Sequence, residues 1–364
     1  MLTESGPVMR ETPTPVAGPG EVVVRLAHGA ISGADVQFAT IASAMKNGYR
    51  GVLGHEGCGV VVSAGPATRP GAPDPARFIG KLVAINSVIA CAKCERCRSG
   101  VATHCLQREV LGLGIGNDAA APKRGTLGQF IAVPATAVEL VPAKVSAQSA
   151  ALANTIAGVL HAARFVRIEH KTYVTVLGDG ATGLLMAQWL VRANASVRVL
   201  GTRPDRLALC ERWGIKHRDI SDAGQRNDQD VVIDCTGSPE GFELAMRFVR
   251  PRGKVIVKVL PAPMQSEFSG FAAEMASISP AAHPNSVAKS NAGFRPDLSW
   301  AMSGEVEVAF AGHGTLSDAL AALVREELDV TPFLSPRVAF DRAASGFAMV
   351  RDQRAIRVVV DFAQ

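Results

Sequence analysis

Apolar residues in the first part of the chain form short runs rather than long helical patterns. The runs at residues 21–26, 59–63 and 81–85 are separated by segments rich in Gly and Pro, among them residues 65–75. Short runs with turn residues between them are typical of β-strands. The pattern therefore predicts a compact β-rich domain over the first 145 or so residues.

Farther along the chain, apolar runs alternate with helical patterns. The strand-like runs lie at residues 174–177, 197–200, 231–234 and 254–259. Strands that alternate with helices predict a parallel, doubly wound sheet.

A polar segment at residues 261–305 interrupts this alternation and lacks clear periodicity. A segment of this kind favours a lid or a partly ordered insertion. A strand-like run at 306–310, helical patterns at 316–326 and 343–351, and a last strand-like run at 355–362 follow it. We therefore expect the chain to end in regular structure rather than in a tail.

A glycine-rich turn connects the first strand of the alternating part to the helix after it. The turn consists of Gly178, Asp179, Gly180, Ala181, Thr182 and Gly183. In the spacing G-x-G-x-x-G, the first glycine allows the sharp turn and the second lets a pyrophosphate approach the backbone. The third lets the helix pack on the strand, and the helix N-terminus attracts the anion. An ordinary glycine-rich turn is the alternative, but the position between strand and helix favours dinucleotide binding.

Composition and charge narrow the class of protein. The chain has 364 residues, 48% hydrophobic and 20% charged, with a formal net charge of +5 that is not gathered into runs. This length predicts two domains, and the mild charge does not indicate a nucleic-acid surface. The N-terminal stretch has no apolar region of a secretory signal, and the apolar window at residues 150–166 contains Asn154, His161 and Arg164. We therefore expect a cytoplasmic protein without a membrane span.

Four of the seven cysteines lie close together in the sequence, with the spacing C-x2-C-x2-C-x7-C. They are Cys91, Cys94, Cys97 and Cys105. Four thiolates can surround one tetrahedral Zn²⁺, and a site with four protein ligands has a structural role. An iron–sulfur cluster and a chance grouping of buried cysteines are the alternatives. We interpret the group as a structural zinc site and expect Cys58 and Cys235 to be packed free thiols.

The order of these motifs resembles the zinc-containing medium-chain dehydrogenase/reductases, the alcohol dehydrogenase-like group. The resemblance rests on the Gly-His-Glu-Gly segment at residues 54–57, the cysteine spacing and the glycine turn. It implies an α/β protein with a GroES-like β-rich catalytic domain, a Rossmann domain with a doubly wound parallel sheet, and a substrate cleft between them. It further implies a hydride-transfer enzyme that uses a nicotinamide cofactor and assembles as a homodimer or homotetramer.

The resemblance also sets the expected domain boundaries. Residues 1–153 form the catalytic domain, with a zinc-binding lobe at about 88–110. Residues 154–312 form the cofactor domain with the insertion at 261–305, and residues 313–364 return to the catalytic domain.

The end of the second strand in the alternating part indicates which nicotinamide cofactor is used. In members that prefer NAD(H), an acidic residue here accepts the ribose hydroxyls. This chain instead has Gly201, Thr202 and Arg203, followed by Arg206. A small residue, a hydroxyl and two guanidinium groups favour a 2′-phosphate, so we predict NADP(H) rather than NAD(H). The alternative is that both arginines are solvated residues at a helix start. The turn after the third strand, with Thr236 and Gly237, is expected to contact the cofactor as well.

The resemblance implies three ligands for a catalytic zinc ion, and two of them are changed in this chain. Ser32 stands where the family has a Cys, and the third ligand falls at Asn154 or Thr155, whereas His55 is retained. Neutral oxygens bind Zn²⁺ more weakly than thiolate or carboxylate groups, so we expect the catalytic zinc to be lost or atypical, although Glu56 could serve as a replacement ligand.

Without this zinc, a carbonyl or a conjugated alkene would be polarised by hydrogen-bond donors. The candidates are Ser32, His55, Asn154 and Tyr49, of which Tyr49 has packing as its alternative role. The sequence therefore predicts an NADP(H)-dependent oxidoreductase of small alcohols and carbonyls. A zinc-independent enone reductase and a silent NADP(H)-binding scaffold or sensor are the alternatives.

Overall fold

The computed structural model describes residues 2–3, 6–43, 51–68, 74–112, 124–169, 172–224, 226–259 and 298–362. The chain forms two compact units. Unit 1 comprises Met1–His161 and Gly312–Gln364, and unit 2 comprises Ala162–Ala311. The predicted position of Tyr49 and the segment 261–297 lie outside the described residues.

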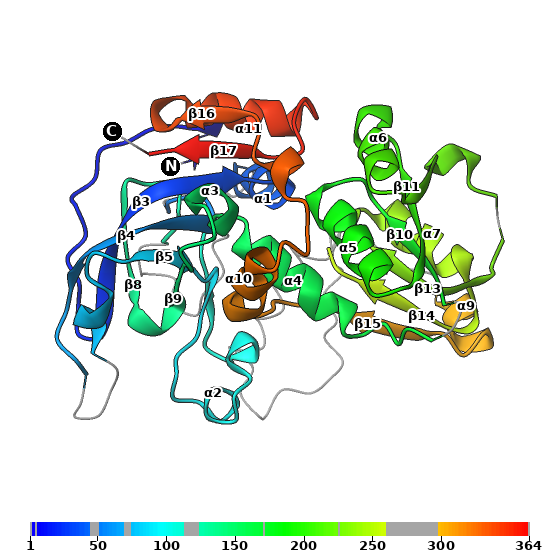
Figure 1. The fold of residues 1–364 in the computed structure, drawn as a ribbon, viewed down its shortest axis with the longest axis horizontal. Helices are drawn as coiled ribbons and strands as arrows, with labels where there is room; N and C mark the ends of the chain where they lie inside the picture. Colours follow the sequence, from blue (N-terminus) through cyan, green and yellow to red (C-terminus); the bar gives the residue numbers. More distant parts are fainter. Residues whose placement is uncertain are drawn as a thin grey trace, which may run out of the picture. The chain divides into compact units, whose positions relative to one another are not determined.

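A sheet of seven strands organises unit 1 (Figure 1). Six strands form the order β16-β17-β3-β4-β5-β9, and β8 pairs with β3 off this path. Their bounds are β3 (Glu21–Ile31), β4 (Glu56–Ala64), β5 (Leu82–Ile85), β8 (Phe130–Pro134), β9 (Val138–Leu140), β16 (Arg337–Ala339) and β17 (Val358–Asp361). All pairs are antiparallel except β16 with β17.

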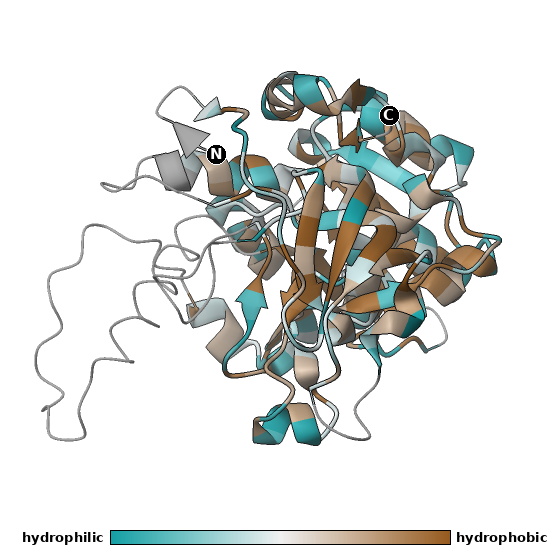
Figure 2. Ribbon diagram, turned by 90° about the vertical axis from the view of Figure 1, so that its left-hand side faces the viewer, coloured by the Kyte–Doolittle hydropathy of each residue, from teal (hydrophilic) through white to brown (hydrophobic). Residues whose placement is uncertain are grey.

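The core of unit 1 forms around buried apolar side chains of the long strands β3 and β4. Val22, Val24, Leu26 and Val61 are at most 2% exposed and belong to one cluster with residues of the neighbouring strands. A second cluster joins Ile31 to the apolar residues of the C-terminal segment. In Figure 2 the long strands of this sheet are largely brown, the colour of apolar residues. Residues from the first part and from the last part of the chain therefore share this second cluster.

Shorter elements complete unit 1. The helices are α1 (Gly33–Ser43), α2 (Glu95–Arg98), α3 (Ala147–Ala150), α4 (Ala153–Ala163), α10 (Leu316–Val324) and α11 (Ala343–Arg351). Two-stranded pairs are formed by β1 (Leu2–Thr3) with β2 (Gly6–Pro7) and by β6 (Val88–Ile89) with β7 (Glu109–Val110). The short 3₁₀ helices are Pro75–Phe78, Ala102–His104, Ala135–Ala137, Thr331–Phe333 and Phe340–Arg342.

Unit 2 contains a parallel sheet of six strands in the order β12-β11-β10-β13-β14-β15 (Figure 1). The strands are β10 (Tyr173–Leu177), β11 (Ser196–Gly201), β12 (Lys216–Asp219), β13 (Gln229–Asp234), β14 (Val249–Val257) and β15 (Glu307–Phe310). The helices are α5 (Ala181–Arg192), α6 (Pro204–Arg212), α7 (Pro239–Phe248) and α9 (Ser299–Ser303), with a 3₁₀ turn at Ile220–Asp222. Numbered from the first strand of the unit, this order is 3-2-1-4-5-6, the arrangement of a Rossmann fold.

The strand order of unit 2 fixes where a ligand can bind. The order reverses between β10 and β13, because the chain moves outward on one side of β10 and returns to continue on the other. Ligands of open α/β sheets bind outside the carboxyl ends of the strands at such a reversal. The glycine turn follows β10 directly and therefore lies at this position.

The predicted fold class is confirmed by these sheets. Every strand-like run named from the sequence overlaps a strand, and the helical patterns at 316–326 and 343–351 correspond to α10 and α11. Among the described residues, no helix is long and apolar enough to cross a membrane.

Candidate functional site

The glycine turn of unit 2 has the geometry that a pyrophosphate requires. Gly178 has a φ of +105°, in the left-handed region that favours glycine. A Cβ on Gly183 would lie 2.0 Å from the carbonyl oxygen of Gly178, so only glycine allows α5 to start this close to β10. A Cβ on Gly180 would meet nothing within 4 Å, so the backbone at the start of α5 is open to a ligand. The turn therefore fits the diphosphate of a dinucleotide, bound at a helix N-terminus.

A carboxylate lies at the end of β11, although the sequence of that strand end contains none. Asp179 of the glycine turn accepts hydrogen bonds through Oδ2 from the backbone N–H groups of Thr202 at 2.7 Å and Arg203 at 2.8 Å. Its Oδ1 lies 3.6 Å from a guanidinium nitrogen of Arg206. A Cβ on Gly201 would lie 2.4 Å from Asp179 Oδ2, so the glycine makes room for this carboxylate. The sequence of this strand end indicates no carboxylate. The structure nevertheless places one there, because the side chain of Asp179 reaches it from another loop.

The turn after β13 also points toward the reversal of the sheet. Asp234 is fully buried and accepts hydrogen bonds through Oδ1 from the backbone N–H and hydroxyl of Thr236. Burial raises the pKa of Asp234, and its Oδ2 has no hydrogen-bond partner in the structure. Gly237 has a φ of +70°, which lets the chain turn into α7. Cys235 beside them is a buried free thiol, as expected.

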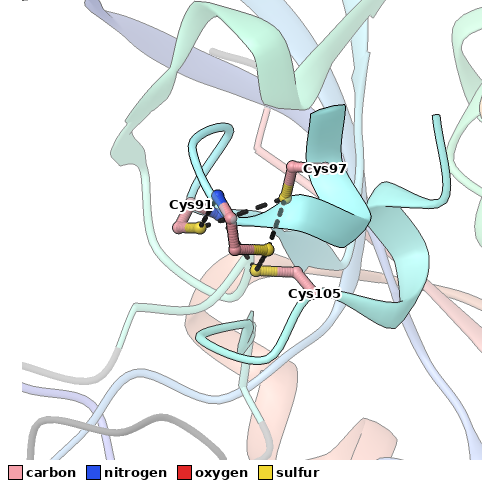
Figure 3. Close-up of side chains that lie close together, drawn as sticks. Cys91, Cys97 and Cys105 are labelled. Atoms are coloured by element: carbon pink, nitrogen blue, oxygen red, sulfur yellow. Dashed lines mark hydrogen bonds between the residues drawn. The ribbon is translucent and has the colours of Figure 1, made fainter. Parts of the chain in front are cut away.

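The four cysteines of the lobe in unit 1 converge on one point. Their sulfur atoms all lie within 4.8 Å of one another. Figure 3 shows three of them, Cys91, Cys97 and Cys105, with their sulfur atoms close together. The Sγ–Sγ distance is 3.4 Å from Cys94 to Cys97, 3.8 Å from Cys94 to Cys105 and 4.0 Å from Cys91 to Cys97. A tetrahedral ion with Zn–S bonds of about 2.3 Å places sulfur atoms about 3.8 Å apart. The cluster therefore fits a structural zinc site.

Backbone N–H groups donate hydrogen bonds to two of these sulfur atoms, which favours the thiolate form that binds a cation. The N–H groups of Cys91 and Gln107 donate to Cys105 Sγ, each at 3.3 Å, and the N–H of Cys94 donates to Cys91 Sγ at 3.4 Å. Backbone N–H groups lower the pKa of Cys94 to about 6, whereas burial raises the pKa of Cys97 to about 12. A bound dication would deprotonate all four thiols and hold the lobe between β6 and β7.

Metal analysis tests this site directly. We expect one zinc ion per chain in the purified protein and less than half of that in a Cys105→Ser variant, because a hydroxyl replaces a buried thiolate ligand. The matched control is Cys210→Ser, which alters a buried cysteine in unit 2 and should leave the zinc content unchanged. Iron in place of zinc, or equal zinc in both variants, would contradict the assignment.

The retained histidine of unit 1 is held by a buried aspartate. His55 Nδ1 lies 2.8 Å from Asp35 Oδ1, and Asp35 is fully buried near the start of α1. The hydroxyl and the N–H of Ser32 both donate to Asp35 Oδ2 at 2.8 Å. Burial opposes both charges, but the attraction between the two groups prevails. It lowers the pKa of Asp35 and raises the pKa of His55. Asp35 thus fixes the proton on Nδ1, which leaves Nε2 of His55 for another partner.

Glu56 is committed to a buried ion pair. Its Oε1 accepts from the backbone N–H of Thr155 at 3.0 Å and from the hydroxyl of Thr155 at 2.6 Å, and its Oε2 pairs with Arg357. Glu56 and Arg357 are at most 2% exposed, and Arg357 also donates to the Thr155 hydroxyl at 3.0 Å. The pair joins the start of β4 to α4 and to the segment before β17.

Asn154 is likewise occupied by the backbone. Its Nδ2 donates to the carbonyl of Ile85 at 2.8 Å and to that of His55 at 3.4 Å, and its Oδ1 accepts from the N–H of Ser87 at 2.9 Å. The amide therefore ties α4 to the end of β5 and to the His55 turn. Both N–H groups of the Asn154 amide are thus engaged, so the amide cannot donate to a substrate as predicted in this geometry. We therefore assign Asn154 a positioning role.

The residues around His55 do not fit a catalytic zinc ion. The Ser32 hydroxyl donates to Asp35, the Asn154 oxygen accepts from the backbone, and both carboxylate oxygens of Glu56 are engaged. Among the described residues, the cysteine lobe is the one group that gathers three or more His, Cys, Asp or Glu ligand atoms. One imidazole and two occupied neutral groups lack the charge that holds the ion.

Sequence reasoning missed three partners in these networks. Asp35 lies three residues after Ser32, but no local pattern indicated that it is the partner of His55. Arg357 was read as part of a strand, although an arginine inside an apolar run signals a buried countercharge. Asp179 was assigned only to the glycine turn, and no local pattern shows that its side chain crosses to β11.

Comparison with known proteins agrees with this architecture. The alcohol dehydrogenase GroES-like domain matches residues 18–143. L-Threonine 3-dehydrogenase of Rhizobium rhizogenes is 26% identical over 99% of this chain and 96% of its own length. The same enzyme of Sinorhizobium medicae is 30% identical over 67% of this chain and 66% of its own length.

Solved structures share the fold over nearly the whole chain. A protein of Sinorhizobium meliloti, described as a zinc-binding dehydrogenase bound to NADP, matches with a TM-score of 0.74 at 20% identity. That match covers 97% of this chain and 95% of the other. Acetophenone reductase of Geotrichum candidum, in complex with NAD, has a TM-score of 0.75 at 20% identity, with 97% and 92% covered.

Fold, cysteine lobe and glycine turn together define a two-domain dehydrogenase. The chain belongs to the zinc-type medium-chain dehydrogenase/reductase superfamily, the alcohol dehydrogenase-like group, and is an NAD(P)-dependent oxidoreductase.

Proposed function

We propose that this protein is an NADP(H)-dependent oxidoreductase that interconverts a small alcohol and its carbonyl compound without a catalytic zinc ion. The observation that carries the proposal is the Asp35–His55 pair, which is intact although the other zinc donors are replaced and engaged. The NADP-bound structure of the Sinorhizobium meliloti relative supports the choice of cofactor. Arg203 and Arg206 beside the end of β11 favour the same choice.

Unit 2 supplies the cofactor site in this proposal. The open backbone at Gly180 and the N-terminus of α5 hold the diphosphate. Thr236 and Gly237, after β13, lie on the edge of the sheet that holds the nicotinamide half of the cofactor. The bound cofactor supplies the hydride.

Unit 1 supplies the proton. Reduction of a carbonyl adds a hydride to carbon and a proton to oxygen, and the proton can come from Nε2 of a protonated His55. Asp35 stabilises that imidazolium through Nδ1, and Ser32 holds Asp35 in turn. In the oxidation direction, neutral His55 accepts the alcohol proton at Nε2 while the hydride leaves carbon. His55 therefore replaces part of what a Lewis acid does for the alkoxide.

A cofactor titration tests the proposal. We expect the purified protein to quench or shift NADPH fluorescence with a Kd in the micromolar range, about −8 kcal/mol, because the turn and strand end are already formed. A Gly183→Val variant should lose this binding, because its Cβ would meet the carbonyl of Gly178. Gly224→Val is the matched control, since a Cβ there meets nothing within 4 Å. Absence of NADPH binding in the wild-type protein would exclude the proposal.

Enone reduction and a silent scaffold are the competing functions. Both follow from the altered zinc donors, since an enone needs only hydrogen-bond polarisation and a scaffold needs no chemistry. A panel of alcohols with NADP⁺, and of aldehydes, ketones and enones with NADPH, separates them. Turnover of alcohols and carbonyls alone supports the proposal, turnover of enones alone supports the reductase, and binding without turnover supports the scaffold.

A further inference from the structure

We infer that Asp179 is the residue that sets the balance between NAD(H) and NADP(H), by supplying from the glycine turn the carboxylate that the end of β11 lacks. The inference rests on the proposed function, because it concerns the adenosine end of the same cofactor. It differs from the expected roles of Arg203 and Arg206, which concern attraction of a 2′-phosphate alone.

The position of the carboxylate is the first observation. Asp179 is 7% exposed, and its Oδ2 is bound by the N–H groups of Thr202 and Arg203 at the end of the second strand. NAD-preferring Rossmann enzymes place an acidic residue at this strand end, where it accepts the ribose hydroxyls. Asp179 brings the same charge to the same strand end from a different loop. The absence of a side chain at Gly201 makes this possible, because a Cβ there would clash with the carboxylate.

The charge around the strand end is the second observation. Arg206 faces Asp179 Oδ1 at 3.6 Å, and Arg203 pairs with Asp205 at 3.2 Å. The two guanidinium groups and the two carboxylates sum to zero formal charge, +2 and −2. A 2′-phosphate, which adds up to two negative charges, is attracted by the arginines and repelled by Asp179. A ribose hydroxyl can donate to the carboxylate without this repulsion.

The consequence is a limited preference between the two cofactors. Arg203 and Arg206 favour NADP(H), and Asp179 offsets them by favouring the free ribose. Removing only the charge of Asp179 should separate these effects. Asparagine is suitable for this purpose, because its side-chain oxygen can still accept from the N–H groups of Thr202 and Arg203.

The test compares Kd values for NADH and NADPH in the wild-type protein and in Asp179→Asn. For the wild type we expect the two Kd values to differ by no more than about tenfold. In Asp179→Asn the ratio of Kd for NADH to Kd for NADPH should rise by about tenfold or more, the effect of one charged hydrogen bond. NADPH should bind more tightly and NADH more weakly.

Two controls keep the result interpretable. Glu211→Gln removes the same charge from an exposed side chain of α6 and should leave the ratio unchanged. Asp179→Ala removes both the charge and the backbone hydrogen bonds, and its thermal unfolding reports whether the strand end still folds.

The outcomes are distinct. Equal weakening of both cofactors in Asp179→Asn would show that the carboxylate only clamps the backbone, and would overturn the inference. Wild-type protein that binds NADPH but not NADH would also overturn it. Wild-type protein that binds neither cofactor would instead contradict the proposed function.

Discussion

Replacing Arg357 with methionine is expected to lower the free energy of unfolding by about 3–5 kcal/mol, because it leaves the buried Glu56 carboxylate without its countercharge. The carboxylate has no exposed surface, and its remaining partner would be Thr155 alone. Methionine keeps most of the apolar contact of the arginine stem, so the loss reports mainly on charge. Denaturant unfolding of the zinc-loaded protein measures the effect.

An exposed ion pair of the same sheet provides the control. Arg337 pairs with Asp361 at 2.8 Å, and its side chain is 49% exposed. Arg337→Met should therefore cost no more than about 1 kcal/mol. If Arg357→Met lowered the free energy of unfolding as little as Arg337→Met does, the buried Glu56–Arg357 pair would contribute little to stability.

A double variant separates the interaction from its parts. Glu56→Gln with Arg357→Met removes both charges, so its cost should be clearly below the sum of the two single variants. Simple additivity would mean that the two side chains act independently, which their direct contact does not allow.

Local sequence patterns predicted the parts of this fold that depend on neighbouring residues. The glycine turn is one example, since Gly178 and Gly183 act within one strand–turn–helix unit. The cysteine lobe is another, because its ligands lie within a short segment. In both cases the spacing alone restricts the geometry enough to indicate a ligand.

The strand pattern failed where burial is weak. Residues Lys216–Asp219 form β12, yet the sequence there is Lys-His-Arg-Asp and shows no apolar run. β12 lies at the end of the strand order and pairs only with β11. An edge strand buries little surface, so its hydrogen bonds to the neighbouring strand, rather than its side chains, determine its conformation.

The networks of the site could not be read from local patterns, because their members are distant in sequence. Glu56 and Arg357 are 301 positions apart, and Asp179 and Thr202 are 23 apart. Sequence showed that the strand end of β11 lacked an acid, but only the fold showed which loop approaches it. The same limit applies to Asn154, whose amide is used up by the carbonyl of Ile85 and the N–H of Ser87.

In the proposed function, these networks give His55 a role that does not depend on a metal ion. Asp35 would orient the imidazole whether or not an ion is bound, since it contacts Nδ1 and not Nε2. A serine in place of the family's thiolate adds a hydrogen bond to that aspartate rather than a ligand. Under the proposed function, this arrangement holds a proton carrier rather than a metal ion. This interpretation makes His55 the residue whose loss should matter most for turnover.

Replacing His55 with asparagine is expected to reduce kcat by about 10²–10⁴, the usual contribution of a positioned general acid or base. The Kd for NADPH should not change, because the proposed cofactor site lies in unit 2. Steady-state oxidation of NADPH with whichever carbonyl substrate the wild-type protein turns over measures kcat, and a fluorescence titration measures Kd.

His28 offers a matched control for this variant. It forms a second histidine–aspartate pair in unit 1, with His28 Nδ1 at 2.8 Å from Asp361 Oδ1. His28→Asn should leave kcat close to the wild-type value, because the His28–Asp361 pair, where β3 pairs with β17, is separate from the Asp35–His55 pair. Added free imidazole should restore part of the activity of His55→Asn with no rise in zinc content per chain, since it can carry the missing proton without a metal ion. If zinc rather than imidazole restored turnover, or if a chelator abolished the wild-type activity while the cysteine lobe kept its metal, His55 would be a metal ligand and the proton-transfer role would be wrong.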